Sequence, residues 1–144
     1  MKCRDIMTKY LKMIHPDSTV KDAVQIMKDL NCGVVPVVGT NNEIMGIVTD
    51  RDITIYTVLN NKDPEKTKVS EFMSKPVITC KADDDIDLAI EKMKNNKIRR
   101  IPIVDDNNRV IGIISLGDVA VISKEEHETF EALENISSPV SGAK

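Results

Sequence analysis

Apolar positions recur along the first half of the chain at two spacings, which predict alternating strands and helices. The apolar residues 11–14 predict a short strand. Within residues 20–30, apolar side chains follow one another at intervals of three and four, which is typical of one buried helical face. A continuous run of Val and Pro over residues 34–38 predicts a buried strand, and residues 43–48 its antiparallel partner. A second helix follows over residues 50–59.

The same order of elements returns in the second half. We predict a strand over residues 77–80 and a helix over residues 83–96. Residues 99–104 and 110–114 then predict a hairpin, and residues 116–123 a closing helix. The second half therefore repeats the first, element by element.

The repeat is visible residue by residue at a constant offset. Gly46 and Gly112 are 66 residues apart, and so are Asp52 and Asp118. The same offset, without insertion, relates Met7 to Met73, Ala23 to Ala89, Met27 to Met93 and Pro36 to Pro102. Self-similarity at a fixed period indicates a structural repeat.

The repeat defines the domain organisation that we predict. Repeats cover residues 4–60 and 70–123, and the polar residues 61–69 link them. Residues 124–144 follow as an acidic helix with a loose tail. Phe130 and Leu133 are the apolar side that we expect for that helix.

Composition restricts the functional classes. Hydrophobic residues make up 41% of the 144 residues and can form a core, but aromatic residues are only 3%, so that core consists of aliphatic residues and Met. The net charge of −3 argues against a nucleic-acid-binding surface. No apolar run approaches the roughly 18 residues of a membrane span, and the N-terminus lacks the apolar core of a secretion signal. We expect a cytoplasmic protein.

The three cysteines, Cys3, Cys32 and Cys80, are widely spaced and form no C-x-x-C motif. We interpret them as free thiols in a reducing compartment. A metal or redox site that also uses His15 or His127 is the alternative, although the spacing does not favour it.

Motifs of catalysis are missing from the sequence. There is no phosphate-binding G-x-x-x-x-G-K-[ST] loop, no G-x-S-x-G nucleophile elbow and no H-E-x-x-H zinc motif. The acidic run at residues 83–87 does not match a calcium loop, because Leu88 and Lys94 occupy the positions of the required Gly and Glu. Carboxylates in the first turn of a helix explain this run better. We expect no enzyme.

The best candidate chemistry lies where a strand enters a helix, once in each repeat. Thr49 and Asp52, and likewise Ser115 and Asp118, place a hydroxyl and a carboxylate three residues apart at a helix start. A carboxylate there can accept hydrogen bonds from ribose hydroxyls. The hydroxyl and the free N–H groups of the helix start can hold a phosphate. The alternative is that these residues are plain N-caps and first-turn acids.

These motifs carry a resemblance to a known family. Residues 34–53 and 101–118, with the leading segments 5–8 and 70–74, resemble the cystathionine β-synthase (CBS) domain. The resemblance covers about residues 4–122. It implies an α/β (α+β) fold of two β-α-β-β-α repeats about a pseudo-two-fold axis, called a Bateman module, which commonly forms a homodimer.

The resemblance also implies a function. Such pairs have two clefts that bind adenosine-containing ligands: AMP, ADP, ATP, sometimes S-adenosylmethionine or a dinucleotide. We therefore expect a regulatory module that senses an adenine nucleotide, needs no other cofactor, and acts in trans on an effector protein. The alternative is a homodimeric interaction module with no functional ligand.

The resemblance assigns Thr49 and Asp52 to one cleft, and Ser115 and Asp118 to the other. The residues that it implies for the adenine slots are Tyr10, Leu11, Lys12, Val35 and Pro36, and Pro76, Val77, Ile78, Ile101 and Pro102. The strand prolines remove a backbone donor at the same place in both repeats, which predicts a gap in strand pairing there.

Three arginines distinguish the two repeats. Arg51 stands where the second repeat has Gly117, and Arg99 and Arg100 stand where the first has Gly33 and Val34. A guanidinium matches phosphate geometry, so we expect these arginines to bind phosphate and to make the clefts unequal. The alternative for each arginine is a surface charge that binds no ligand.

Overall fold

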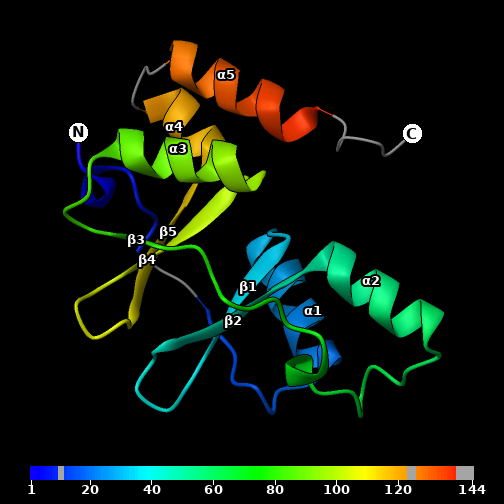
Figure 1. Ribbon diagram of the computed structural model, residues 1–144. Coiled ribbons are helices and arrows are strands. Elements are labelled where there is room, and N and C mark those ends of the chain that lie inside the picture. Colours follow the sequence, from blue (N-terminus) through cyan, green and yellow to red (C-terminus); the bar gives the residue numbers. More distant parts are fainter. Residues whose placement is uncertain (10–11, 123–125, 139–144) are drawn as a thin grey trace. The chain divides into compact units, whose positions relative to one another are not determined.

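The computed structural model describes residues 1–9, 12–122 and 126–138, and it confirms a mixed α/β fold with a duplicated order of elements (Figure 1). The first half contains η1 (Cys3–Asp5), α1 (Val20–Leu30), β1 (Val34–Val38), β2 (Ile44–Thr49) and α2 (Asp50–Leu59). The second half contains η2 (Val69–Glu71), β3 (Cys80–Lys81), α3 (Ile86–Asn96), β4 (Arg100–Val104), β5 (Val110–Ser115), α4 (Leu116–Ile122) and α5 (Glu126–Ser137).

The elements form two compact units. Unit 1 consists of Met1–Leu11, Ile78–Asp106 and Ile111–Lys144, and unit 2 of Lys12–Val77 with Asn107–Val110. Unit 1 contains the sheet β3-β4-β5 with α3, α4 and α5, whereas unit 2 contains the antiparallel pair β1-β2 with α1 and α2. Each unit has its own aliphatic core. Among the described residues, no helix is long and apolar enough to span a membrane.

The units differ from the sequence repeats because the two leading segments are exchanged. In unit 1, the backbones of Thr8 and Ile113 exchange two hydrogen bonds of 2.9 and 3.1 Å. In unit 2, Ser74 and Ile47 do the same at 2.9 and 3.1 Å. Each leading segment therefore pairs with a strand of the other repeat, the first with β5 and the second with β2. The boundaries 4–60 and 70–123 remain a prediction about the duplicated sequence.

The first strand of each repeat is shorter than expected. Of residues 12–14, only Ile14 pairs with β1, through a parallel bridge to Val37, and β3 begins only at Cys80 rather than at residue 77. The register of the bridge, with Ile14 N–H donating to the Pro36 carbonyl oxygen, directs the nitrogen of Pro36 toward the carbonyl of Lys12. Proline has no N–H to donate, so the ladder stops there.

The C-terminal helix α5 buries a different face from the one expected. Phe130 and Leu133 are 67% and 45% exposed, whereas Ala132 is fully buried and Ile136 packs against the unit 1 core. The helix lies on α3 and α4 (Figure 1), and small residues such as Ala132 and Thr129 allow this close approach. The apolar face predicted from the sequence was therefore wrong. We expected residues 137–144 to be loose. Ser137 is instead the last residue of α5, and residues 139–144 lie outside the described part of the chain.

Candidate functional site

In unit 2, the candidate hydroxyl and carboxylate lie together at the start of α2. Thr49 is the N-cap of the helix, and its Oγ1 accepts a hydrogen bond of 3.1 Å from the backbone N–H of Asp52. Both side chains are half-buried. The Asp52 carboxylate accepts no hydrogen bond from any residue that the structure describes. Thr49 is therefore an N-cap, while the carboxylate of Asp52 keeps its hydrogen-bonding capacity for a ligand.

In unit 1, the equivalent residues form a closed pair. The backbone N–H of Asp118 donates to Ser115 Oγ at 3.0 Å, and the backbone N–H of Ser115 donates to Asp118 Oδ2 at 3.1 Å. This reciprocal arrangement is a capping box, with Asp in the place of the usual Glu. One oxygen of Asp118 is engaged within its own helix cap. The two candidate sites therefore differ at their carboxylates.

An aromatic pair, which we did not identify from the sequence, lies beside Asp52. The rings of Tyr56 and Phe72 stack with centroids 4.8 Å apart and planes at 22°. They border a hollow of about 240 Å³ whose lining residues are Asp52, Ile55, Tyr56, Leu59, Asn60 and Phe72. In unit 1, the corresponding residues at the 66-residue offset are Ile122 and Ile6, so the aromatic wall belongs to unit 2. That difference between the repeats is the signal that would have revealed the pair.

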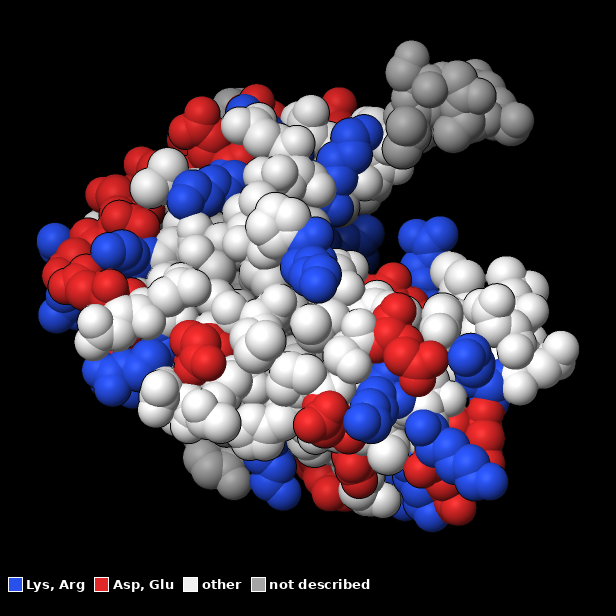
Figure 2. Space-filling view, turned by 60° about the horizontal axis from the view of Figure 1, so that its bottom comes forward, with Lys and Arg blue, Asp and Glu red and all other residues white. Residues whose placement is uncertain are grey.

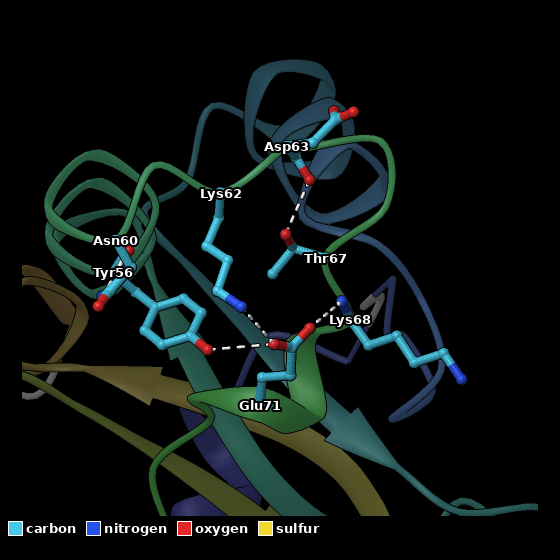
Figure 3. Close-up of polar contacts among 7 residues, drawn as sticks. All are labelled: Tyr56, Asn60, Lys62, Asp63, Thr67, Lys68 and Glu71. Atoms are coloured by element: carbon cyan, nitrogen blue, oxygen red, sulfur yellow. Dashed lines mark hydrogen bonds and ion pairs between the residues drawn. The ribbon is translucent and has the colours of Figure 1, made fainter.

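A charged network around Glu71 binds the hydroxyl group of Tyr56 (Figure 3). Glu71 accepts hydrogen bonds from the Tyr56 hydroxyl at 3.1 Å, from Lys62 Nζ at 3.3 Å and from the Lys68 backbone N–H at 3.0 Å. The Lys68 N–H, with the Tyr56 hydroxyl, lowers the pKa of Glu71, and Glu71 in turn raises the pKa of Lys62. The linker and η2 thus fix the ring that faces the hollow.

Arg51 is not in the same hollow as Asp52. It lines a second open hollow of about 360 Å³ with Asp50, Thr54 and Ile55, and Ile55 borders both. Consecutive helical residues point about 100° apart, which explains the separation. A phosphate held by Arg51 would therefore lie around the side of α2 from the Asp52 carboxylate.

Arg99 and Arg100 are exposed residues at the start of β4 in unit 1. The carbonyl oxygen of Arg99 accepts a hydrogen bond of 2.8 Å from the N–H of Leu116, the residue that follows Ser115. The backbone of Arg99 is thus adjacent to the Ser115–Asp118 helix start. The corresponding Gly33 in unit 2 lies under Asp50, whose carboxylate would be 3.0 Å from a Cβ placed on this glycine.

The residues expected at the adenine slots occupy different environments. Val35 and Ile101 are fully buried in the cores of their units, and Pro36 and Pro102 are buried beside them. The remaining described positions are more open: Lys12 and Pro76 are exposed, and Val77 and Ile78 are half-buried. Tyr10 and Leu11 lie outside the described residues.

The strand prolines create the gap that the sequence predicts. Pro36 faces the carbonyl of Lys12, and the equivalent register between Cys80 and Ile103 directs Pro102 toward the carbonyl of Ile78. Neither proline can donate to that carbonyl. Each unit therefore has a backbone acceptor beside the candidate slot that the neighbouring strand does not satisfy.

The charges are mixed rather than segregated. On the face shown in Figure 2, acidic and basic side chains alternate without a single basic field. The residues that the structure describes include no group of three or more side chains suited to hold a metal ion. His15 Nδ1 lies 3.0 Å from the Val38 carbonyl oxygen, which satisfies that ring nitrogen. The alternative of a metal site at His15 gains no support.

The duplicated motif and its flanking segments match known proteins. A family model of the CBS domain matches residues 3–58 and again residues 69–125. The chain belongs to the CBS-domain family. As a CBS pair, it is 37% identical over 134 residues to the CBS domain-containing protein YhcV of Bacillus subtilis (strain 168), covering 93% of this chain and 94% of YhcV.

Solved structures support the same assignment. The CBS pair resembles the conserved CBS domain protein TA0289 from Thermoplasma acidophilum with a TM-score of 0.81 and 27% identity, over 94% of this chain and 75% of that one. It also resembles the CBS domain pair of protein MJ0100, solved in complex with 5′-methylthioadenosine and S-adenosyl-L-methionine. The TM-score is 0.76 at 28% identity, over 86% of this chain and 96% of that one.

Proposed function

We propose that this CBS pair is a regulatory module that binds an adenosine-containing ligand of the AMP, ADP and ATP class and acts in trans on an effector protein. The observation that carries the proposal is the hydroxyl and carboxylate placed at a helix start in both units. Thr49 and Asp52 provide these groups in unit 2, and Ser115 and Asp118 provide them in unit 1. CBS pairs are typically regulatory rather than catalytic.

The chemistry of each residue supports a nucleoside as the ligand. The Asp52 carboxylate can accept hydrogen bonds from the two adjacent hydroxyls of a ribose. The Lys12 and Ile78 carbonyls that face the strand prolines are candidate acceptors for a donor such as an adenine amino group. The MJ0100 pair, which binds two adenosine derivatives, shares the fold and 28% of its sequence with this chain. Arg51, Arg99 and Arg100 are the proposed phosphate ligands.

We expect the two units to bind the ligand with different affinities. Unit 2 has an aromatic wall and a carboxylate, that of Asp52, which accepts no hydrogen bond from the described residues. In unit 1 the carboxylate is partly engaged in the helix cap. Aromatic faces favour stacking with a base or ring edge. We therefore assign the stronger site to unit 2.

The competing proposal is a homodimeric interaction module without a functional ligand. Exposed apolar residues on α2 and α4 favour self-association, because Leu59 is 75% and Val121 81% exposed. The two proposals are compatible if a homodimer binds nucleotide. They diverge on whether any adenosine ligand binds.

Calorimetric titration separates them. AMP, ADP, ATP, S-adenosylmethionine and NAD are titrated into the full chain and into Asp52→Ala and Asp118→Ala. Asp87→Ala, which removes an exposed first-turn carboxylate of α3, is the matched control. We expect micromolar binding of at least one ligand, weakened about tenfold or more by one Asp variant and unaffected by the control. A folded protein that binds none of the five would favour the interaction module.

A further inference from the structure

Two buried cysteines meet in unit 1. Cys3, in η1, is 0% exposed, and Cys80, the first residue of β3, is 2% exposed. Both belong to the same hydrophobic core. The backbone N–H of Cys3 donates to the Asp84 carbonyl oxygen at 2.9 Å, and that of Arg4 donates to Ala82 at 3.0 Å. These bonds hold the N-terminal segment along the residues that follow Cys80.

The two thiols influence each other's ionisation. The interaction with the Cys3 thiol lowers the pKa of Cys80, and the nearby Lys92 acts in the same direction. The same interaction, with burial, raises the pKa of Cys3. The Lys92 ammonium is held in place by a bond of 2.8 Å to the Thr79 carbonyl oxygen. A thiolate at one cysteine is thus stabilised by the neighbouring thiol, and a thiolate is the species that reacts with a disulfide.

The internal repeat shows that the core does not need sulfur here. At the 66-residue offset, Cys3 corresponds to Val69 and Cys80 to Ile14. Both of these residues are buried in the core of unit 2, in the equivalent packing between a leading segment and a first strand. Unit 1 differs from unit 2 at both positions at once. Unit 1 thus has a pair of thiols where unit 2 has a pair of aliphatic side chains.

We propose that Cys3 and Cys80 are a redox-active dithiol that closes to an intramolecular disulfide by exchange with a low-molecular-weight disulfide. The thiolate of one cysteine attacks one sulfur of the oxidant, which releases one thiol and leaves a mixed disulfide on that cysteine. The other cysteine then loses its proton and attacks the protein sulfur of this mixed disulfide, releasing the second thiol. The protein loses two hydrogens, and the small disulfide is reduced to two thiols.

The disulfide fixes the exchanged N-terminal segment. It connects Cys3 covalently to β3, five residues before Thr8 pairs with Ile113 on the strand that ends at Ser115. Because the thiols are buried, the oxidant reaches them only when this terminal segment opens locally. Oxidation would then trap the closed state and stabilise unit 1 against unfolding.

The test uses the full chain with Cys32→Ser, which removes the half-buried third thiol. The folded protein is incubated with oxidised glutathione, then examined by intact mass and by thiol titration in denaturant. We expect the loss of two hydrogens, no free thiols, a monomeric band on a non-reducing gel and full reversal by dithiothreitol. The oxidised form should melt on the order of 5–10 °C higher than the reduced form.

Two matched variants complete the test. Cys3→Val and Cys80→Ile, each in the Cys32→Ser background, place the unit 2 residues in unit 1. Both should fold, and neither should form the disulfide. The proposal is overturned if glutathione adducts persist on Cys3 or Cys80 without closure. It is also overturned if the folded protein keeps both thiols under conditions in which unfolded chains are oxidised. Neither outcome depends on nucleotide binding, so the proposed function is tested separately.

Discussion

The side chain of Met7 lies directly over Gly112, so closely that a Cβ on this glycine would be 2.7 Å from Met7 Sδ and 3.0 Å from its Cγ. Met73 covers Gly46 in the same way, at 2.6 and 2.8 Å. The two glycines are thus the places where the exchanged leading segments approach β2 and β5. Their small size is required by contact with the other repeat.

We expect Gly46→Ala and Gly112→Ala each to lower the free energy of unfolding by about 1–3 kcal/mol, because the added methyl overlaps the methionine side chain. Urea unfolding measures the change. Gly117→Ala is the control, since a Cβ there meets only Ser115 Oγ at 3.7 Å. That variant should be unchanged or up to about 1 kcal/mol more stable, because alanine favours helix. Equal losses in all three variants would contradict the packing argument.

The two candidate carboxylates should differ in their contribution to stability. Both Asp52→Ala and Asp118→Ala lose a favourable first-turn charge. Among the bonds of the described residues, only Asp118→Ala also removes one made by the carboxylate, which accepts from the Ser115 N–H. Asp118→Ala should therefore destabilise the protein by about 0.5–1.5 kcal/mol more than Asp52→Ala. Urea unfolding without ligand measures the difference. A larger loss in Asp52→Ala would show that its carboxylate has an internal partner.

The Glu71 network predicts a pH dependence. Because the folded state lowers the pKa of Glu71, its carboxylate stabilises the protein above the unfolded-state pKa of about 4.3. The stabilisation is lost as the pH falls through the lower, folded-state value. Glu71→Gln should thus melt at a lower temperature than the wild type at pH 7, and the gap should close in acid. Glu91→Gln, an exposed glutamate of α3, corrects for the loss of one charge. A gap that is constant with pH would exclude the network as its source.

Arg51 should distinguish a nucleotide from a nucleoside. If its guanidinium binds phosphate, Arg51→Ala should weaken AMP binding about tenfold or more and change adenosine binding less than twofold. Calorimetry on both ligands provides the comparison, with Lys66→Ala, an exposed charge of the linker, as the control. Equal losses for AMP and adenosine would remove Arg51 from the phosphate ligands. Arg51 and Asp52 line different hollows, so the outcome decides whether one nucleotide contacts both residues.

The buried face of α5 makes a prediction opposite to its sequence pattern. Ala132→Leu should destabilise the protein by about 1–3 kcal/mol, because the position is fully buried against α3 and α4. Phe130→Ala should change the stability by no more than about 0.5 kcal/mol, because that ring is 67% exposed. Thermal unfolding of the two variants decides the point. The reverse order would mean that Phe130 packs in solution.

What the sequence alone determined is local or periodic. The duplication follows from pairs such as Gly46 and Gly112, and the helices follow from apolar spacing, because backbone geometry sets those periods. The separation of Thr49 and Asp52 is likewise local: three residues at a helix start bring a hydroxyl and a backbone N–H together in any fold. The gap at Pro36 depends only on the missing N–H of proline. The structure bears out all of these features.

Only the tertiary structure decided which distant segments meet. The spacing of Met7 and Met73 is the same whether each leading segment packs on its own repeat or on the other, so the exchange could not be predicted from the pattern. The same holds for Cys3 with Cys80 and for Tyr56 with Phe72. The tertiary fold brings the residues of each pair together, and the 66-residue repeat does not indicate that they meet. The face of α5 was misjudged because Ala132 is too small to dominate a hydrophobic pattern, yet its size permits close helix packing. Long-range contacts depend on shape and on competing partners, and a periodic pattern encodes neither.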